Sequence, residues 1–188
     1  TAYTPGSVVA GSIDSAGRRD AYTFTLDAER RLVFDSRLNS TVFKWSLVGP
    51  RGTVVEGRNF ADSDSADFTA SPVLSLPAGE YTLYVDPDND GTGTYGFRLV
   101  DLASADVAAL TPGSSVSGTL DPGHSTHFYS FEGTALERVQ FDLLSESRNS
   151  AHWRLIDPNG RVVFGPLATD DLAVTLPATG RYVLMLEG

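Results

Sequence analysis

The 188-residue sequence contains no cysteine, a single lysine (Lys44) and no long apolar run. The absence of cysteine excludes a disulfide framework, a thiolate nucleophile and a cysteine-ligated zinc site. Large exported bacterial proteins often share this absence. No stretch approaches the roughly 18–20 consecutive apolar residues that a membrane-spanning helix needs, so we expect no membrane insertion.

Acidic residues outnumber basic residues by 24 to 14, which gives a net charge of −10 and a pI near 4.6. This charge would repel the phosphates of nucleic acid, so we expect no nucleic-acid partner. Apolar residues make up 41% of the chain. That share is enough to build a core, and it argues against a disordered chain.

The chain contains two copies of one sequence pattern. The motif TPGSVVAGSID at 4–14 returns as TPGSSVSGTLD at 111–121. Four further pairs follow in the same order: 20–26 with 127–133, 31–36 with 138–143, 44–55 with 152–163, and 74–85 with 174–186. This repeat predicts two homologous modules, residues 1–103 and 104–188. Positions filled alike in both copies should serve the shared fold, whereas positions private to one copy could serve a separate function.

Each copy reads as a series of short strands. Segments such as AYTFTL (21–26) and YTLYV (81–85) alternate apolar and polar residues, which is the period of a half-buried strand. Proline and glycine in GPRG (49–52) and DPNG (157–160) are typical of tight turns. The best helical candidates, 26–32 and 133–139, lead directly into β-rich runs, and we interpret them as turns. The pattern predicts an all-β chain of two tandem antiparallel sandwiches.

Five aromatic positions are equivalent in the two copies. They are Trp45 with Trp153, Tyr22 with Tyr129, Phe24 with Phe131, Phe34 with Phe141, and Tyr81 with Tyr182. Such residues could form a stacking platform for sugar rings, but their duplication and their alternation along strands favour core packing.

The order of these motifs resembles the bacterial pre-peptidase C-terminal domain family. The motifs are G-x-[IL]-D, D-x-Y-x-F, W-x-L-x-x-P-x-G, LPAGEYTLYV and a closing YGFRLVD. The resemblance implies jelly-roll-like β-sandwich modules of secreted proteases and large surface proteins, and hence an extracellular or bacterial cell-surface location. Family members are accessory modules implicated in secretion, in binding of matrix or polysaccharide, and in spacing along long proteins.

The second copy lacks a counterpart of the last strand of the first. After Tyr81 the first copy continues to TYGFRLVDL (94–102), whereas after Tyr182 the second has only VLMLEG. A missing last strand would leave one sheet with an unpaired edge. We therefore expect the second module to be incomplete at its C-terminal end, or its edge to be covered by another segment.

The sequence contains no motif of a known catalytic site. The three histidines, His124, His127 and His152, all belong to the second copy. Neither a G-x-S-x-G nor an H-E-x-x-H motif is present. His124 and His127 lie at a turn entering a strand, where residues three apart point to opposite sides, so we interpret them as solvated. We expect the chain not to be an enzyme.

The segment DPDNDGTG (86–93) has the spacing of a calcium loop. Asp86, Asp88, Asn89 and Asp90 could offer oxygen ligands to Ca²⁺. An EF-hand is excluded because its twelfth position, which requires glutamate, is Phe97. Two interpretations stay open: a calcium-binding loop, and a polar hairpin turn between the last two strands of the first copy. We expect no other cofactor.

A second acidic run, ADSDSAD (61–67), belongs to a longer loop of the first copy, and we interpret it as solvated. The connection between the modules (100–113) is short and contains apolar residues. This composition predicts a stiff junction in which Leu102 and Leu110 contact a module.

Two functions fit these observations. The first is a non-catalytic structural or adhesive pair of repeat modules from a large exported bacterial protein, whose partners are neighbouring modules of the same polypeptide. The alternative is a carbohydrate- or matrix-binding accessory module that targets a secreted enzyme, with polysaccharide or extracellular matrix as its partner.

Overall fold

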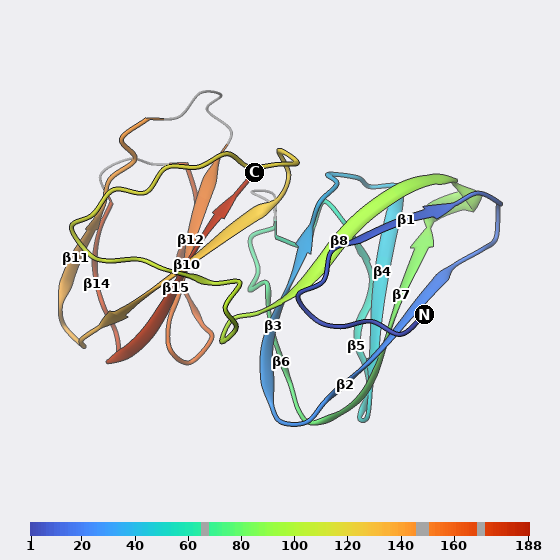
Figure 1. The fold of residues 1–188 in the computed structure, drawn as a ribbon, viewed down its shortest axis with the longest axis horizontal. Helices are drawn as coiled ribbons and strands as arrows, with labels where there is room; N and C mark the ends of the chain where they lie inside the picture. The colour runs from blue at the N-terminus through green and yellow to red at the C-terminus, as the bar shows by residue number, and fades with distance from the viewer. Residues whose placement is uncertain (65–67, 146–150, 169–171) are drawn as a thin grey trace.

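The structure is a computed structural model that describes residues 1–64, 68–145, 151–168 and 172–188. The chain forms two β-sandwich bodies that lie side by side (Figure 1). The predicted all-β fold of two tandem antiparallel sandwiches is confirmed. Two parallel contacts depart from the antiparallel pattern: a short pairing of β9 (Ala108–Ala109) with β10 (Thr126–Gly133), and an isolated bridge between Ala2 and Thr23.

The first body consists of two four-stranded sheets. One sheet has the order β1 (Val9–Ile13), β8 (Gly93–Asp101), β3 (Arg30–Ser36), β6 (Val73–Leu76). The other has the order β2 (Asp20–Leu26), β7 (Gly79–Pro87), β4 (Phe43–Gly49), β5 (Gly52–Asn59). Alternate residues of these strands point inward, and seventeen of them form one buried core together with Phe60, which follows β5. At its centre the rings of Phe34 and Trp45 stack with centroids 4.2 Å apart.

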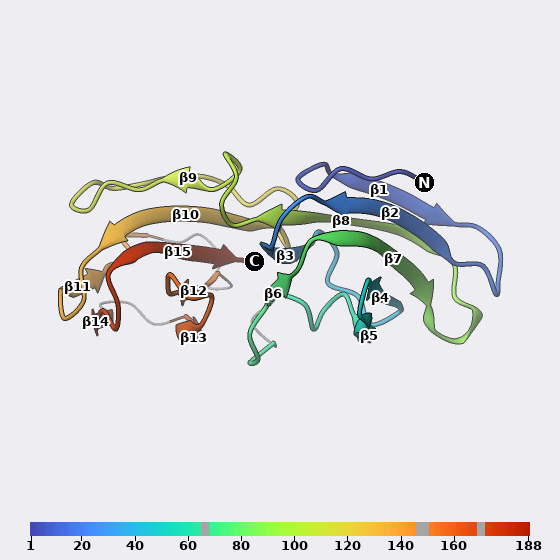
Figure 2. The same ribbon diagram turned by 90° about the horizontal axis from the view of Figure 1, so that it is seen from below.

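The second body repeats part of this arrangement. Its larger sheet has the order β13 (Val162–Leu167), β12 (His152–Ile156), β15 (Gly180–Glu187), β10, β9. Its smaller sheet has two strands, β11 (Arg138–Phe141) and β14 (Leu172–Thr175). Figure 2 shows β9 and its flanking segments running along the outer side of β10. Among the described residues no strand corresponds to β8, as the sequence predicted.

The aromatic residues shared by the two copies play the same structural part in each. The Tyr81 hydroxyl donates to the carbonyl of Pro77 at 2.8 Å, and the Tyr182 hydroxyl donates to that of Ala178 at 2.6 Å. Each of these tyrosines also stacks on a phenylalanine of the neighbouring strand. Four of the five pairs are buried, and Tyr22 and Tyr129 are half-buried. Core packing of the duplicated aromatics is confirmed.

The two candidate helical segments are turns leading into strands, as predicted, since β3 begins at Arg30 and β11 at Arg138. The only helix in the described ranges is a single turn, η1 (Asp88–Asp90). No helix there is long and apolar enough to pass through a membrane.

Candidate functional site at the module junction

The contact between the two bodies has an apolar centre. Strand β3 is buried on both faces: Leu32 and Phe34 enter the core of the first body, and Val33 points to the second. The junction cluster contains Val33, Val100, Leu102, Val107, Phe128, Ile156, Val183 and Met185. The predicted contacts of the connection are confirmed, because Leu102 is buried in this cluster and Leu110 packs on the core of the second body.

A buried polar network surrounds Thr126, the first residue of β10. The Thr126 amide donates to an Asp35 carboxylate oxygen at 3.0 Å. Arg98 donates to the other oxygen of Asp35 and to the Thr126 carbonyl, the latter at 3.0 Å. Strands β3 and β8 of the first body therefore hold the start of β10 through side chains as well as through apolar contact.

Asp64 extends this network from the long acidic loop of the first copy. Its carboxylate accepts from the Ser36 amide at 3.2 Å and from the Thr126 hydroxyl at 2.7 Å. Because Asp64 is only 2% exposed, the interpretation of residues 61–67 as a solvated loop is wrong for Ala61, Ser63 and Asp64, all of which are buried. Residues 65–67 of this run lie outside the described ranges.

Arg154 forms a second buried link between the bodies. Its guanidinium donates to Glu187, with Nε 2.8 Å from the carboxylate. It also donates to the carbonyls of Phe68 and Ala70 in the first body, both at 2.7 Å. The planar guanidinium of arginine has several donors that match this set of acceptors. Burying the charged group without such acceptors would cost several kcal/mol.

Burial perturbs the acidic groups of the junction. Burial, with the nearby charge of Asp35, raises the pKa of Asp64 well above its usual range. Burial also raises the pKa of Asp35, against the opposing effect of Arg98. It raises the pKa of Glu187 to about 7, although Arg154 stabilises the charged carboxylate. Desolvation is the leading cause in all three.

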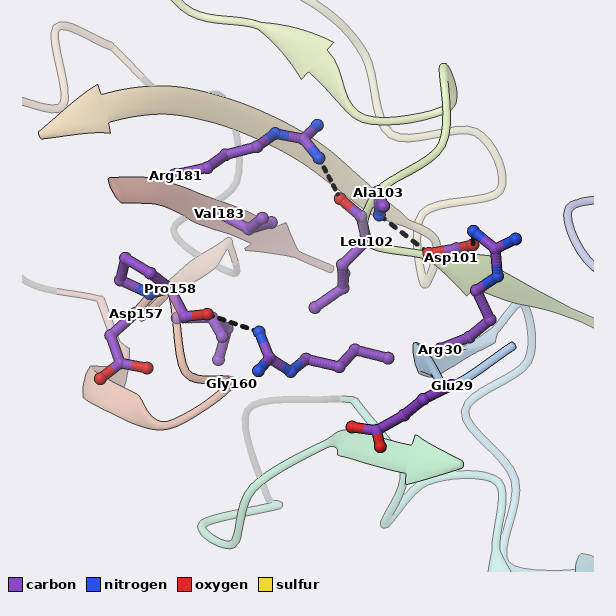
Figure 3. A pocket seen from close by; sticks show the side chains of 12 residues that line it. Glu29, Arg30, Asp101, Leu102, Ala103, Asp157, Pro158, Gly160, Arg181 and Val183 are labelled. Carbon is purple, nitrogen blue, oxygen red and sulfur yellow. Dashed lines mark hydrogen bonds and ion pairs between the residues drawn. The ribbon is translucent and has the colours of Figure 1, made fainter. Parts of the chain in front are cut away.

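A cavity of about 420 Å³ opens beside the junction (Figure 3). Its arginines already hold protein acceptors: Arg31 donates to the carbonyl of Pro158, and Arg181 donates to that of Leu102 at 2.7 Å. Arg30 lies 3.7 Å from the Asp101 carboxylate. The bonds of Arg31 and Arg181 join residues of the first copy to the second, so they stabilise the contact between the two bodies.

The calcium-loop candidates lie at the far end of β7. The connection from β7 to β8 is not a hairpin, because the two strands belong to different sheets and residues 88–92 cross between them. The hairpin interpretation is therefore wrong. The chain crosses to the other sheet because the aromatic residues of β8 enter the core from that side. Phe97, which occupies the position where an EF-hand would need glutamate, is fully buried.

Lys44 already neutralises part of this acidic loop. Its ammonium lies 3.1 Å from the Asp88 carboxylate, and Lys44 is the register partner of Asp86. Asn89 and Asp90 adopt positive φ angles of 50° and 58°, as polar turn residues do. In the described ranges no three His, Cys, Asp or Glu side chains lie close enough together to hold a metal ion.

The histidine pair has a mixed environment. His124 is exposed, as predicted, whereas His127 is half-buried with its Nδ1 atom 3.4 Å from the Tyr129 hydroxyl. Desolvation lowers the pKa of His127.

Sequence reasoning missed the residues of the junction, although a signal was available. Arg154 occupies a position filled by Ser46 in the first copy. Asp64 lies in a loop that is longer in the first copy than in the second. Applying the rule that private positions can serve a separate function to these charged residues would have found them.

Replacing Arg154 tests the buried link directly. We expect Arg154→Met to lower the free energy of unfolding by about 3–5 kcal/mol, because Glu187 would stay buried without its partner. Adding Glu187→Leu should recover at least about 1 kcal/mol of this loss. Denaturant titration measures both, with exposed Arg51→Met as a control that should change stability by less than about 0.5 kcal/mol. A loss below about 1 kcal/mol for Arg154→Met would contradict the assignment.

The buried carboxyls make stability depend on pH. Because the folded pKa of Asp64 is raised, the fold binds a proton more readily than the unfolded chain does. The free energy of unfolding attributable to this group therefore rises as pH falls from 7.5 towards 5. Asp64→Asn should make this rise smaller, because the substitution removes the titrating carboxyl group. Urea unfolding at both pH values checks it, and an equal effect of exposed Asp86→Asn would argue against it.

Calcium addition tests the two interpretations of residues 86–93. Since Asp88 is paired with Lys44 and the carboxylates are not gathered into a ligand set, we expect several millimolar Ca²⁺ to leave the melting temperature unchanged. A site with millimolar affinity would raise it. A rise that Asp88→Asn with Asp90→Asn abolishes would establish the calcium interpretation instead.

The chain matches no protein-family model and no curated protein. Among solved structures it is similar to the CUB1-EGF-CUB2 domains of rat MASP-1, with 9% identity and a TM-score of 0.30, over 96% of this chain and 92% of that one. It is also similar to a DUF4785 family protein from Legionella pneumophila, with 10% identity and a TM-score of 0.22, over 99% of this chain and 55% of that one. Likenesses at these scores carry no functional information.

Proposed function

We propose that the chain is a non-catalytic pair of structural and adhesive repeat modules that acts as a stiff spacer in a large exported bacterial protein. The observation that carries this proposal is the junction, in which Arg154, Asp64 and Asp35 are buried and bonded across the two bodies. A hinge between independent domains would leave such charged residues in water, where an ion pair contributes only about 0–1 kcal/mol.

In the proposed spacer, the junction fixes the position and orientation of one body relative to the other. Apolar packing of Val33 and Val100 against Phe128 resists sliding, and directional hydrogen bonds to Thr126 fix rotation. Resemblance of the duplicated motifs to pre-peptidase C-terminal domains supports an extracellular or cell-surface setting, with neighbouring modules of the same polypeptide as the first partners.

Exposed side chains give less support to the carbohydrate- or matrix-binding alternative. Sugar-binding surfaces present aromatic rings to solvent. In the described part of the chain the large apolar residues that are exposed are all aliphatic: Val8, Val42, Val48, Val54, Val116, Leu136 and Leu144. For this reason we place recognition of polysaccharide second to spacing.

Small-angle X-ray scattering tests the spacer. We expect one fixed arrangement of the two bodies to reproduce the profile at both 0.1 M and 1 M salt, because buried bonds are little screened. Asp35→Ala should broaden the range of arrangements, since it removes the acceptor of Arg98 and of the Thr126 amide. Exposed Asp27→Ala, which removes a surface ion pair with Arg30, is the matched control and should leave the profile unchanged. A wild-type profile that only an ensemble of intermodule angles can fit would refute the proposal.

A further inference from the structure

We propose that a second cavity at the junction binds the carboxylate group of a small organic acid. This cavity has a volume of about 270 Å³. Its lining comes from both bodies: Arg37 and Arg98 from the first, and Ser125, His127 and Tyr129 from the second. None of the described residues lines both this cavity and the larger one of Figure 3, so the two are separate sites.

Ser125 gives the first indication of a ligand. It lines the cavity and is only 2% exposed. Its Oγ atom is the one buried side-chain polar atom in the described ranges without a hydrogen-bond partner. The Ser125 amide, in contrast, donates to the carbonyl of Pro122 at 2.9 Å, so the turn before β10 is held by its backbone. A buried hydroxyl without a partner costs free energy, which a bound carboxylate oxygen would recover by accepting its proton in a hydrogen bond.

Arg37 supplies the positive charge of the site. Its guanidinium donates to the main-chain carbonyl of Asp121 at 3.0 Å, and in the described ranges it forms no ion pair with a carboxylate. Arg98 differs, because its charge is already paired with buried Asp35. A guanidinium has five donors in one plane and pairs with a carboxylate through two parallel hydrogen bonds. Half-buried Arg37 can therefore hold a carboxylate while it keeps its bond to Asp121.

His127 and Tyr129 add neutral donors on one side of β10, since alternate residues of a strand point the same way. The Tyr129 hydroxyl lies 3.4 Å from Nδ1 of His127. Desolvation, together with the charge of Arg98, lowers the pKa of His127, so its imidazole is mainly neutral at pH 7 and carries one N–H donor. The wall of the cavity thus combines one unpaired guanidinium with hydroxyl and imidazole donors.

Two exposed carboxylates restrict the charge of the ligand. Asp106 and Asp121 also line the cavity, and both are exposed. They would repel the second negative charge of sulfate or phosphate, whereas the single charge of a carboxylate is balanced by Arg37. In the part of the chain that the structure describes, no three His, Cys, Asp or Glu side chains are gathered to hold a metal ion. The donors therefore favour a singly charged anion.

The imidazole of His127 can report binding, because the chain has only two other histidines. The experiment is an NMR pH titration of the histidine side chains, with sodium acetate as the probe and sodium chloride at equal ionic strength as the reference. We expect about 50 mM acetate to raise the pKa of His127 by roughly 0.3 or more, since a nearby negative charge favours the imidazolium. Exposed His124 should respond less.

Two variants locate the probe in the cavity. Ser125→Ala removes the unpartnered hydroxyl, so we expect it to weaken the response of His127 to acetate without lowering the melting temperature. Arg37→Gln removes the positive charge and should abolish the response. Arg51→Gln is the matched control, because Arg51 is exposed and does not line the cavity, and it should respond as the unaltered chain does.

Four results would overturn the proposal. Equal responses to acetate and chloride would mean that the cavity holds only water or any small ion. A response to sulfate as large as that to acetate would refute selection for a single charge. An unchanged response in Arg37→Gln would place the bound acetate elsewhere. A lower melting temperature for Ser125→Ala would show that the hydroxyl stabilises the fold without a ligand. None of these outcomes bears on the spacer, which scattering tests separately.

Discussion

The outer face of the β3–β8 pair must be kept from water, and the rest of the structure follows from this constraint. A sheet of a solvated sandwich has one apolar face, but here Val33 and Val100 place apolar side chains on the second face as well. The second body covers them with Phe128 and Met185. Covering this face also encloses Asp35, which then needs partners. Arg98 and Thr126 supply them.

Burying charged groups at the junction costs desolvation free energy. What these groups contribute is directional specificity, because their hydrogen bonds require a particular geometry. A buried ion pair is often no more stabilising than apolar residues of the same volume. Its hydrogen bonds nevertheless permit one geometry, whereas apolar packing alone tolerates small shifts. Arg154 illustrates this, because its bonds to Glu187 and to the carbonyls of Phe68 and Ala70 form together only in one arrangement of the bodies. A spacer benefits from such a junction.

Much of the fold could be predicted from the sequence because the core residues occur at equivalent positions in both copies. Strand alternation and the duplicated aromatics placed Trp45 and Trp153, and Tyr81 and Tyr182, in equivalent cores. The junction could not be read in the same way. Asp64 stands in a run of Asp, Ser and Ala that is typical of a solvated loop, and only the fold brings it under Thr126. The β7–β8 connection has hairpin composition, yet long-range packing of Phe97 sends it across the sandwich.

The described residues of the two bodies also differ in their strands, because the second body has no counterpart of β1 or β8. In the first, β8 supplies Tyr95, Phe97 and Leu99 to the core and Arg98 to the junction. In the second, Phe141 packs against Trp153, as Phe34 packs against Trp45, and also against Phe164, with ring centroids 6.1 and 5.2 Å away from Phe141. Phe164 has no aromatic counterpart in the first copy, where Glu56 occupies its position. Phe141 thus contacts a phenylalanine private to the second copy, whereas its counterpart Phe34 contacts Phe97 of β8.

In the proposed spacer, the junction holds the two modules in one arrangement. The cysteine-free chain allows spin labels to be attached only where cysteines are introduced. Thr25 and Glu132 are exposed, equivalent positions on β2 and β10, one in each body. Pulsed electron–electron double resonance between labels at these positions should give a single narrow distance distribution that Arg154→Met broadens. A broad or multiple distribution in the otherwise unaltered chain would contradict the account.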